Sequence, residues 1–183
     1  SQEGKLLYSQ KEQGKVLLTD DCWYKDEKFF TREPVKTEWK LVSKEFVPGS
    51  IGKDYIEQTK VLRDYLKSNG ELSKEEAAEC SDKTLVEIAE LMKADWKEAA
   101  KRLTALKINK NHRRQPVEIL YDWIVRFKNR QERGILEGKY DWSSALSSNG
   151  NIVNIGYADS DGASVYYWIP DNAIDNIGVC SSR

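Results

Sequence analysis

Cysteine and histidine, the side chains best suited to nucleophilic or metal chemistry, are scarce in this sequence. It holds three cysteines, Cys22, Cys80 and Cys180, and one histidine, His112. The cysteines are widely separated and show no zinc-binding spacing, which indicates lone thiols in a reducing compartment or buried thiols. His112 has no acidic neighbour, and no serine or cysteine stands at a spacing that suggests a partner. We therefore expect no enzyme activity, no metal and no cofactor.

The densest basic run, Lys107–Arg114 (KINKNHRR), suggests a different chemistry, contact with phosphate groups. Sites for single-stranded nucleic acid combine positive charges with aromatic rings, and this run contains no aromatic ring. The whole chain carries a formal net charge of −1, so its overall charge does not favour nucleic acid or an anionic membrane. We predict a solvated loop between two helices here and expect no nucleic-acid partner.

The composition of the chain changes at Tyr140. Residues 1–139 contain 20 lysines, 17 glutamates and 6 glutamines, whereas residues 140–183 contain none of these and no histidine or methionine. Asn, Ser, Tyr, Asp and Gly fill the tail instead. These types suit a recognition surface, because tyrosine supplies rigid contact area and the small polar residues supply adaptable hydrogen bonds. A small β-sheet with polar turns is the simpler alternative, since strands also disfavour lysine and glutamate.

The tail must form the elements that position such a surface. Residues 151–157 and 163–168 alternate with the two-residue period of a strand. The Asp161-Gly162 pair between them predicts a tight hairpin. A last short strand is expected at 177–180, after an irregular loop at 169–176 that is rich in turn-forming residues.

Helical periodicity dominates the chain ahead of the tail. Apolar residues recur at helical spacing in the segments 54–68, 85–92, 96–106 and 116–127. Ser73 and Glu76 form the pattern of a capping box, which predicts a further helix start near Lys74. Shorter elements are expected before these helices: a hairpin from 5–9 and 15–19, a loop at 20–34 whose aromatic residues cover the core, and a strand at 37–47.

These elements indicate one α+β domain spanning residues 1–183, with several helices gathered ahead of small antiparallel β-sheets. The length is sufficient to bury a hydrophobic core. No apolar run approaches the roughly 20 residues that cross a bilayer. No signal peptide is visible, so a cytoplasmic location is expected by default.

Several features of the tail resemble a known family. They are Trp142-Ser143-Ser144, the glycine-rich hairpin, the Trp-x-Pro loop at 168–170 and the closing Asn176-Ile177-Gly178-Val179. Together they resemble the C-terminal half of C-type lectin-fold proteins, in the subgroup shared by formylglycine-generating enzymes and the variable proteins of diversity-generating retroelements. The resemblance covers about the last 45 residues well. It implies a C-type lectin-like fold with a helical insertion at 74–114 and a variable-type region at 140–183.

The resemblance to variable proteins also accounts for the composition of the tail. In such systems, adenines of a template are replaced at random during reverse transcription. Asparagine-type codons altered at their first two bases yield most amino acids, but not Lys, Glu, Gln, Met or Trp. The tail lacks four of these five types, and its tryptophans, Trp142 and Trp168, would be scaffold residues.

The function implied by this resemblance is display of a diversified surface to a macromolecular ligand, most simply a protein. The resemblance assigns ten residues to the fixed scaffold: Trp142, Val153, Ile155, Gly156, Gly162, Val165, Trp168, Pro170, Ile177 and Gly178. It assigns eleven residues to ligand binding: Asn154, Tyr157, Ser164, Tyr166, Tyr167, Ile169, Asp171, Asn172, Ile174, Asp175 and Asn176. The identity of the ligand does not follow from the sequence.

Two other functions of the same fold remain as alternatives. An enzyme of the formylglycine-generating type would use Cys180, but that site needs paired thiols and the tail has one. A calcium-assisted carbohydrate-binding domain would use a carboxylate-Pro-amide motif, and Ile169-Pro170-Asp171 lacks the leading carboxylate. Asp175 and its neighbours offer a few oxygen ligands, whereas calcium needs six to eight.

Overall fold

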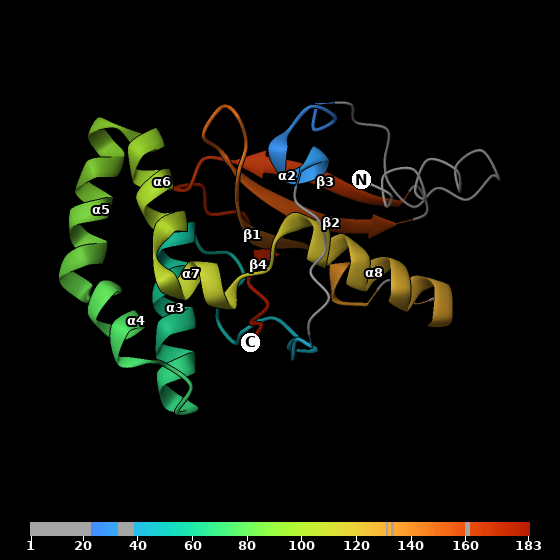
Figure 1. The fold of residues 1–183 in the computed structure, drawn as a ribbon, viewed down its shortest axis with the longest axis horizontal. Helices are drawn as coiled ribbons and strands as arrows, with labels where there is room; N and C mark the ends of the chain where they lie inside the picture. The colour runs from blue at the N-terminus through green and yellow to red at the C-terminus, as the bar shows by residue number, and fades with distance from the viewer. Residues whose placement is uncertain (1–22, 33–38, 131, 133, 160–161) are drawn as a thin grey trace.

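The computed structural model describes residues 23–32, 39–130, 132, 134–159 and 162–183 (Figure 1). The hairpin predicted at 5–9 and 15–19 lies outside these residues. The described helices are α2 (Lys28–Thr31), α3 (Tyr55–Ser68), α4 (Lys74–Glu79), α5 (Asp82–Ala94), α6 (Trp96–Ala105), α7 (Lys107–His112), α8 (Pro116–Arg130) and the short 3₁₀ helix η1 (Gly134–Leu136).

The helix starts follow from side chains that cap the free backbone N–H groups of the first turn. Asp54 caps α3 by accepting a hydrogen bond from the Glu57 amide at 2.7 Å. The predicted capping box of Ser73 and Glu76 is present at the start of α4. Asp95 caps α6, and the next long helix, α8, begins with a proline, which needs no amide partner at this position.

Four strands form one sheet in the order β3-β2-β1-β4. They are β1 (Tyr140–Leu146), β2 (Ile152–Asp159), β3 (Gly162–Trp168) and β4 (Ile177–Gly178). The predicted α+β class is confirmed, with the helices ahead of the sheet in the chain. The expectation of purely antiparallel pairing is wrong for β4, which pairs parallel to β1. Residues 169–176 cross from one edge of the sheet to the other, and β4 therefore runs in the direction of β1.

Helices cover both faces of this sheet, with a hydrophobic cluster on each side. In the first cluster, side chains from α3, α5, α6 and α7 pack against Trp142 and Ile152. In the second, side chains from α2 and α8 pack against Val153, Ile155 and Val165. Figure 1 shows α3 to α7 grouped beside the sheet, with α2 and α8 apart from them. The predicted alternation along β2 is present from Ile152 to Gly156, but each face meets a helical layer.

The segment predicted as a strand at 37–47 is not one over the residues described. It runs along the C-terminal residues, and the amides of Leu41, Ser43 and Val47 donate to the carbonyls of Arg183, Ser181 and Val179. Within this irregular segment, Val42 forms an isolated β-bridge with Ser182. The apolar residues of this segment predicted a regular strand, but the C-terminal residues with which these amides pair are themselves irregular.

The aromatic residues of the 20–34 region cover the core, as expected from the sequence. Tyr24 and Phe29 are buried in the second cluster, and Trp23 and Phe30 pack against it. Within the described residues, no helix is both long enough and apolar enough to cross a membrane.

Candidate functional site

In the C-terminal region, the residues assigned to the scaffold and those assigned to ligand binding differ in burial. The residues assigned to the scaffold are buried, apart from half-buried Trp168: Trp142, Val153, Ile155, Gly156, Gly162, Val165, Pro170, Ile177 and Gly178. Among those assigned to ligand binding, Tyr157 is 44% exposed and Tyr166 is 41% exposed. Asp171 and Asp175 are also exposed. Six others are half-buried: Ser164, Tyr167, Ile169, Asn172, Ile174 and Asn176.

Asn154 is the exception, and its expected place on an outward surface needs correction. Its side chain is fully buried, and neither the oxygen nor the nitrogen of its amide has a hydrogen-bond partner. In the register of the sheet it stands between Trp142 of β1 and Tyr166 of β3. Because β2 is an inner strand with helices over both faces, alternation alone could not bring Asn154 to the surface.

Four residues of three adjacent strands form a polar and aromatic surface that we call the display face: Tyr140, Tyr157, Ser164 and Tyr166. Gly156 of β2 pairs with Tyr140 on one side and Ser164 on the other. The rings of Tyr140 and Tyr157 are stacked, with centroids 5.7 Å apart. The sheet therefore holds the Tyr140 and Ser164 side chains on either side of Gly156, which has no side chain.

A β-bulge turns Tyr157 outward at the edge of the display face. The register shifts between Gly156 and Asp159, and Tyr157 has a left-handed φ of 49°. Its amide donates to the Lys139 carbonyl at 2.7 Å. A Cβ atom at Gly156 would lie 2.1 Å from that same carbonyl oxygen, so only glycine fits here. Bulges commonly re-aim a side chain in this way.

Three aromatic rings run along the edge strand β3. The ring of Tyr166 lies 5.8 Å from that of Tyr167 and 5.2 Å from that of Trp168. Tyr167 also contacts Trp23, with ring centroids 4.5 Å apart. Tyr167 is thus partly a packing residue, whereas Tyr166 has the more exposed ring. Tyr167, which the resemblance assigns to ligand binding, therefore also packs against Trp23.

The loop at 169–176 is attached to the scaffold at several points, and we call it the crossover loop. The Pro170 carbonyl accepts from the Tyr55 amide, and the Asn176 carbonyl accepts from the Tyr140 amide at 2.8 Å. Ile174 packs against the first hydrophobic cluster. These contacts leave the Asp171 and Asp175 side chains exposed. The loop thus combines fixed backbone positions with outward side chains, and its last residue, Asn176, contacts Tyr140 of the display face.

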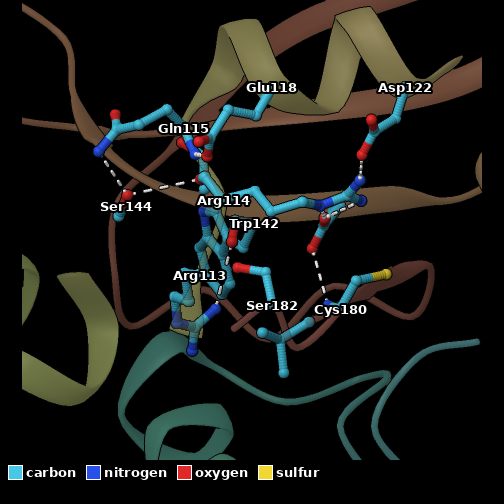
Figure 2. Close-up of polar contacts among 12 residues, drawn as sticks. Arg113, Arg114, Gln115, Glu118, Asp122, Trp142, Ser144, Cys180 and Ser182 are labelled. Carbon is cyan, nitrogen blue, oxygen red and sulfur yellow. Dashed lines mark hydrogen bonds and ion pairs between the residues drawn. The ribbon is translucent and has the colours of Figure 1, made fainter. Parts of the chain in front are cut away.

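A buried ion pair joins the start of α8 to the sheet and to the C-terminal residues (Figure 2). The Arg114 guanidinium donates to Asp141 through Nη2 at 2.6 Å and Nε at 3.2 Å, and through Nη1 to Asp122 at 2.8 Å. Asp141 also accepts from the Cys180 amide at 3.0 Å. The nearby carboxylate of Asp141 raises the pKa of Arg114 in spite of its burial.

The basic run at 107–114 is therefore not the solvated loop that its polarity suggested. Lys107–His112 is helix α7, and His112, Arg113 and Arg114 are buried. The guanidinium of Arg113 lies 3.8 Å from the ring centre of Tyr55 and donates to the Asn109 side chain at 2.8 Å. Burial lowers the pKa of Arg113. Amphipathic arginines can fill a core when aromatic and polar partners surround them.

His112 takes part in a second buried contact of the same region. Its Nε2 lies 3.1 Å from a carboxylate oxygen of Glu76, and its Nδ1 lies 3.1 Å from the Ser182 carbonyl. Sequence reasoning missed these roles of His112 and the two arginines. The sequence showed a dense run of charges between two predicted helices. Such a run does not by itself indicate which charged side chains are buried against partners.

The cysteine on which an enzymatic role depends is enclosed. Cys180 is fully buried, and burial, together with the neighbouring Asp141 carboxylate, raises the pKa of its thiol. Burial likewise raises the pKa of the Cys80 thiol to about 11. A reactive cysteine needs a lowered pKa and access to substrate. Neither thiol has these properties in this conformation.

Comparisons of this chain with protein-family models, with curated proteins and with solved structures return no match. In the described part of the chain, no group of three or more His, Cys, Asp or Glu side chains is placed to hold a metal ion. The site therefore has to be interpreted from its own geometry, which is that of a packed sheet with exposed tyrosines and a crossover loop with exposed aspartates.

Proposed function

We propose that this protein is a ligand-binding module of the C-type lectin type, which displays a diversified surface made by a diversity-generating retroelement. Its target is a macromolecule, and the tyrosine, asparagine and aspartate side chains suit a protein. The observation that carries the proposal is the division of residues 140–178. Positions assigned to the scaffold are enclosed, apart from half-buried Trp168, whereas the positions assigned to variation, apart from Asn154, are exposed or half-buried.

The chemistry of the surface supports contact rather than catalysis. Tyr157 and Tyr166 are exposed aromatic residues of the kind that anchor protein interfaces. Asp171 and Asp175 add exposed negative charges on the crossover loop. Variation of such residues is tolerated because they stand on a packed sheet rather than within its core.

Tolerance to variation is the physical property that the proposal requires. A library that randomises Tyr157, Tyr166, Asp171 and Asp175 together should keep cooperative thermal unfolding in most members, with midpoints shifted by only a few °C. The matched control randomises the buried positions Val153, Ile155 and Val165 and should lose folded protein in most members. If both libraries lose folded protein alike, these exposed residues are structural and the display function fails.

The origin of the surface is tested independently in genomic DNA. A near-copy of the coding sequence for residues 140–178 should lie beside a reverse-transcriptase gene and should differ from it at adenines. Differences spread over all four bases, or no such copy, would contradict the retroelement origin while leaving the binding function open to the library experiment.

A further inference from the structure

The segment that pairs with the C-terminal residues, at 41–43, has the backbone geometry of a strand at the edge of a sheet. The Leu41 and Ser43 amides donate to the carbonyls of Arg183 and Ser181, and the Arg183 amide donates back to the Leu41 carbonyl. Between these bonds, Val42 stands opposite Ser182 in an antiparallel bridge. Figure 1 shows this segment beside the C-terminus. One edge of the segment is therefore occupied by the C-terminal residues.

The backbone groups of Val42 point to the other edge. In an antiparallel pair, successive residues direct their N–H and C=O groups to alternate sides, and Leu41 and Ser43 direct theirs to the C-terminal residues. Within the described part of the chain, neither the amide nor the carbonyl of Val42 has a hydrogen-bond partner. Unpaired backbone groups along an edge are a template for a further strand.

A cavity provides space for such a strand on this side of the segment. It has a volume of about 410 Å³ and opens between residues 40–44, α8 and η1. All five residues of 40–44 border it, whereas none of residues 179–183 does. The cavity therefore lies on the side of the segment away from the C-terminal residues, which is the side to which Val42 directs its backbone. Ile119 and Leu136 give the cavity apolar lining.

Two large apolar side chains of the same segment are exposed. Trp39 is fully exposed, and Leu41 is 60% exposed. Because they are two residues apart, they lie on the same face of an extended segment. A strand added at the edge would place side chains of its own on that face, within reach of both. The exposed pair thus adds apolar contact area beside the unpaired backbone groups.

We propose that this edge binds an extended peptide segment of another protein. The peptide donates a backbone N–H to the Val42 carbonyl and accepts a hydrogen bond from the Val42 amide, so it continues the ladder that the C-terminal residues form on the opposite side. One apolar side chain of the peptide enters the cavity against Ile119 and Leu136, and another packs against Trp39 and Leu41. This inference does not rest on the proposed function of the display face, which is built from other residues.

Proline substitutions test the open edge in the chain alone. Val42→Pro removes an amide that has no partner, and proline is compatible with such an edge position, so the thermal midpoint should change by less than about 2 °C. Ser43→Pro removes the bond to the Ser181 carbonyl and should lower the midpoint by at least about 3 °C. An equally large loss in Val42→Pro would show that its amide is used within the fold and would overturn the proposal.

A library of random heptapeptides displayed on phage and selected on the intact chain supplies the peptide probes. A selected peptide, measured by isothermal titration calorimetry, should bind Val42→Pro at least about tenfold more weakly than the parent chain, because a hydrogen bond is lost. Trp39→Ser and Leu41→Ser should each weaken binding several-fold. Val86→Ser, which alters an exposed apolar residue of α5, and Tyr166→Ser of the display face are the matched controls and should leave binding unchanged.

Two results would overturn the proposal at the level of binding. The first is a selection that yields no peptide with a Kd below about 1 mM for the parent chain. The second is a set of selected peptides that bind Val42→Pro as tightly as the parent chain. If those peptides lose affinity for Tyr166→Ser instead, peptide binding belongs to the display face and not to the edge at Val42.

Discussion

At the scale of single residues, the buried amide of Asn154 is the least expected feature of the chain. It lies in the centre of the sheet, fully enclosed and without a hydrogen-bond partner among the protein groups. Its cross-strand neighbour Trp142 also has an unpartnered indole nitrogen. Because burial of an unpaired polar group opposes folding, this position is not optimised for stability.

We therefore expect Asn154→Leu, which has a similar volume, to stabilise the protein by about 1–2 kcal/mol. The free energy of unfolding from urea titration measures this change. Asn172→Leu is the matched control at a half-buried position of the crossover loop and should change stability little. A loss of stability in Asn154→Leu would show that the amide makes a compensating interaction.

The two described thiols should be inert in the folded protein. Burial raises the pKa of Cys80 to about 11 and raises that of Cys180 well above its usual value, so the reactive thiolate is scarce at neutral pH. Iodoacetamide at pH 7 should modify neither residue until denaturant is added, as peptide mass spectrometry would record. Rapid native modification of Cys180 would instead revive the enzymatic alternative.

At the scale of elements, Glu76 connects the short helices α4 and α7. It closes the capping box with Ser73, accepts from the Asn111 side chain at 2.9 Å and contacts His112. Burial raises the pKa of Glu76, but the hydrogen bonds from Asn111 and Ser73 and the influence of His112 outweigh it, so the net pKa is lowered from its ordinary 4.5.

A lowered folded-state pKa predicts how the contribution of Glu76 depends on pH. Its stabilising effect is fully present above about pH 4.5 and is lost as the pH falls through the lower folded value. Glu76→Gln should cost about 1–3 kcal/mol at pH 7, and its difference from the parent chain should shrink below pH 4. Glu75→Gln, an exposed change in the same helix, should show a much smaller difference at both pH values. A pH-independent effect of Glu76→Gln would contradict this role.

At the scale of the whole molecule, the Arg114–Asp141 pair holds three distant parts of the chain together. Arg114 precedes α8, Asp141 belongs to β1, and the Cys180 amide comes from the C-terminal segment. This junction lies beneath the strand that carries Tyr140 of the display face. The scaffold under the proposed binding surface therefore depends on a contact that involves none of the exposed residues.

Asp141→Asn should destabilise the protein by about 3–5 kcal/mol, because it leaves the buried Arg114 charge without its nearest carboxylate. Asp122→Asn removes the other carboxylate from the same arginine, but the Asp122 side chain is 47% exposed. That second change should cost less than about 1 kcal/mol. Equal effects in urea denaturation would show that burial does not distinguish the two pairs.

The sequence by itself determined the local elements of this protein. Short-range patterns predicted them: the capping box of Ser73 and Glu76, helical spacing in 54–68 and 96–106, and alternation on both sides of the hairpin turn. The division of the tail into scaffold and displayed positions follows from the family resemblance instead, and burial agrees with it apart from Trp168 and Asn154. Only the tertiary structure decided the parallel pairing of β4, the burial of Asn154 and the enclosure of Arg113 and Arg114. Each of these depends on partners that are distant in the chain. The helical or strand periodicity of a segment does not indicate which distant residue a side chain will contact.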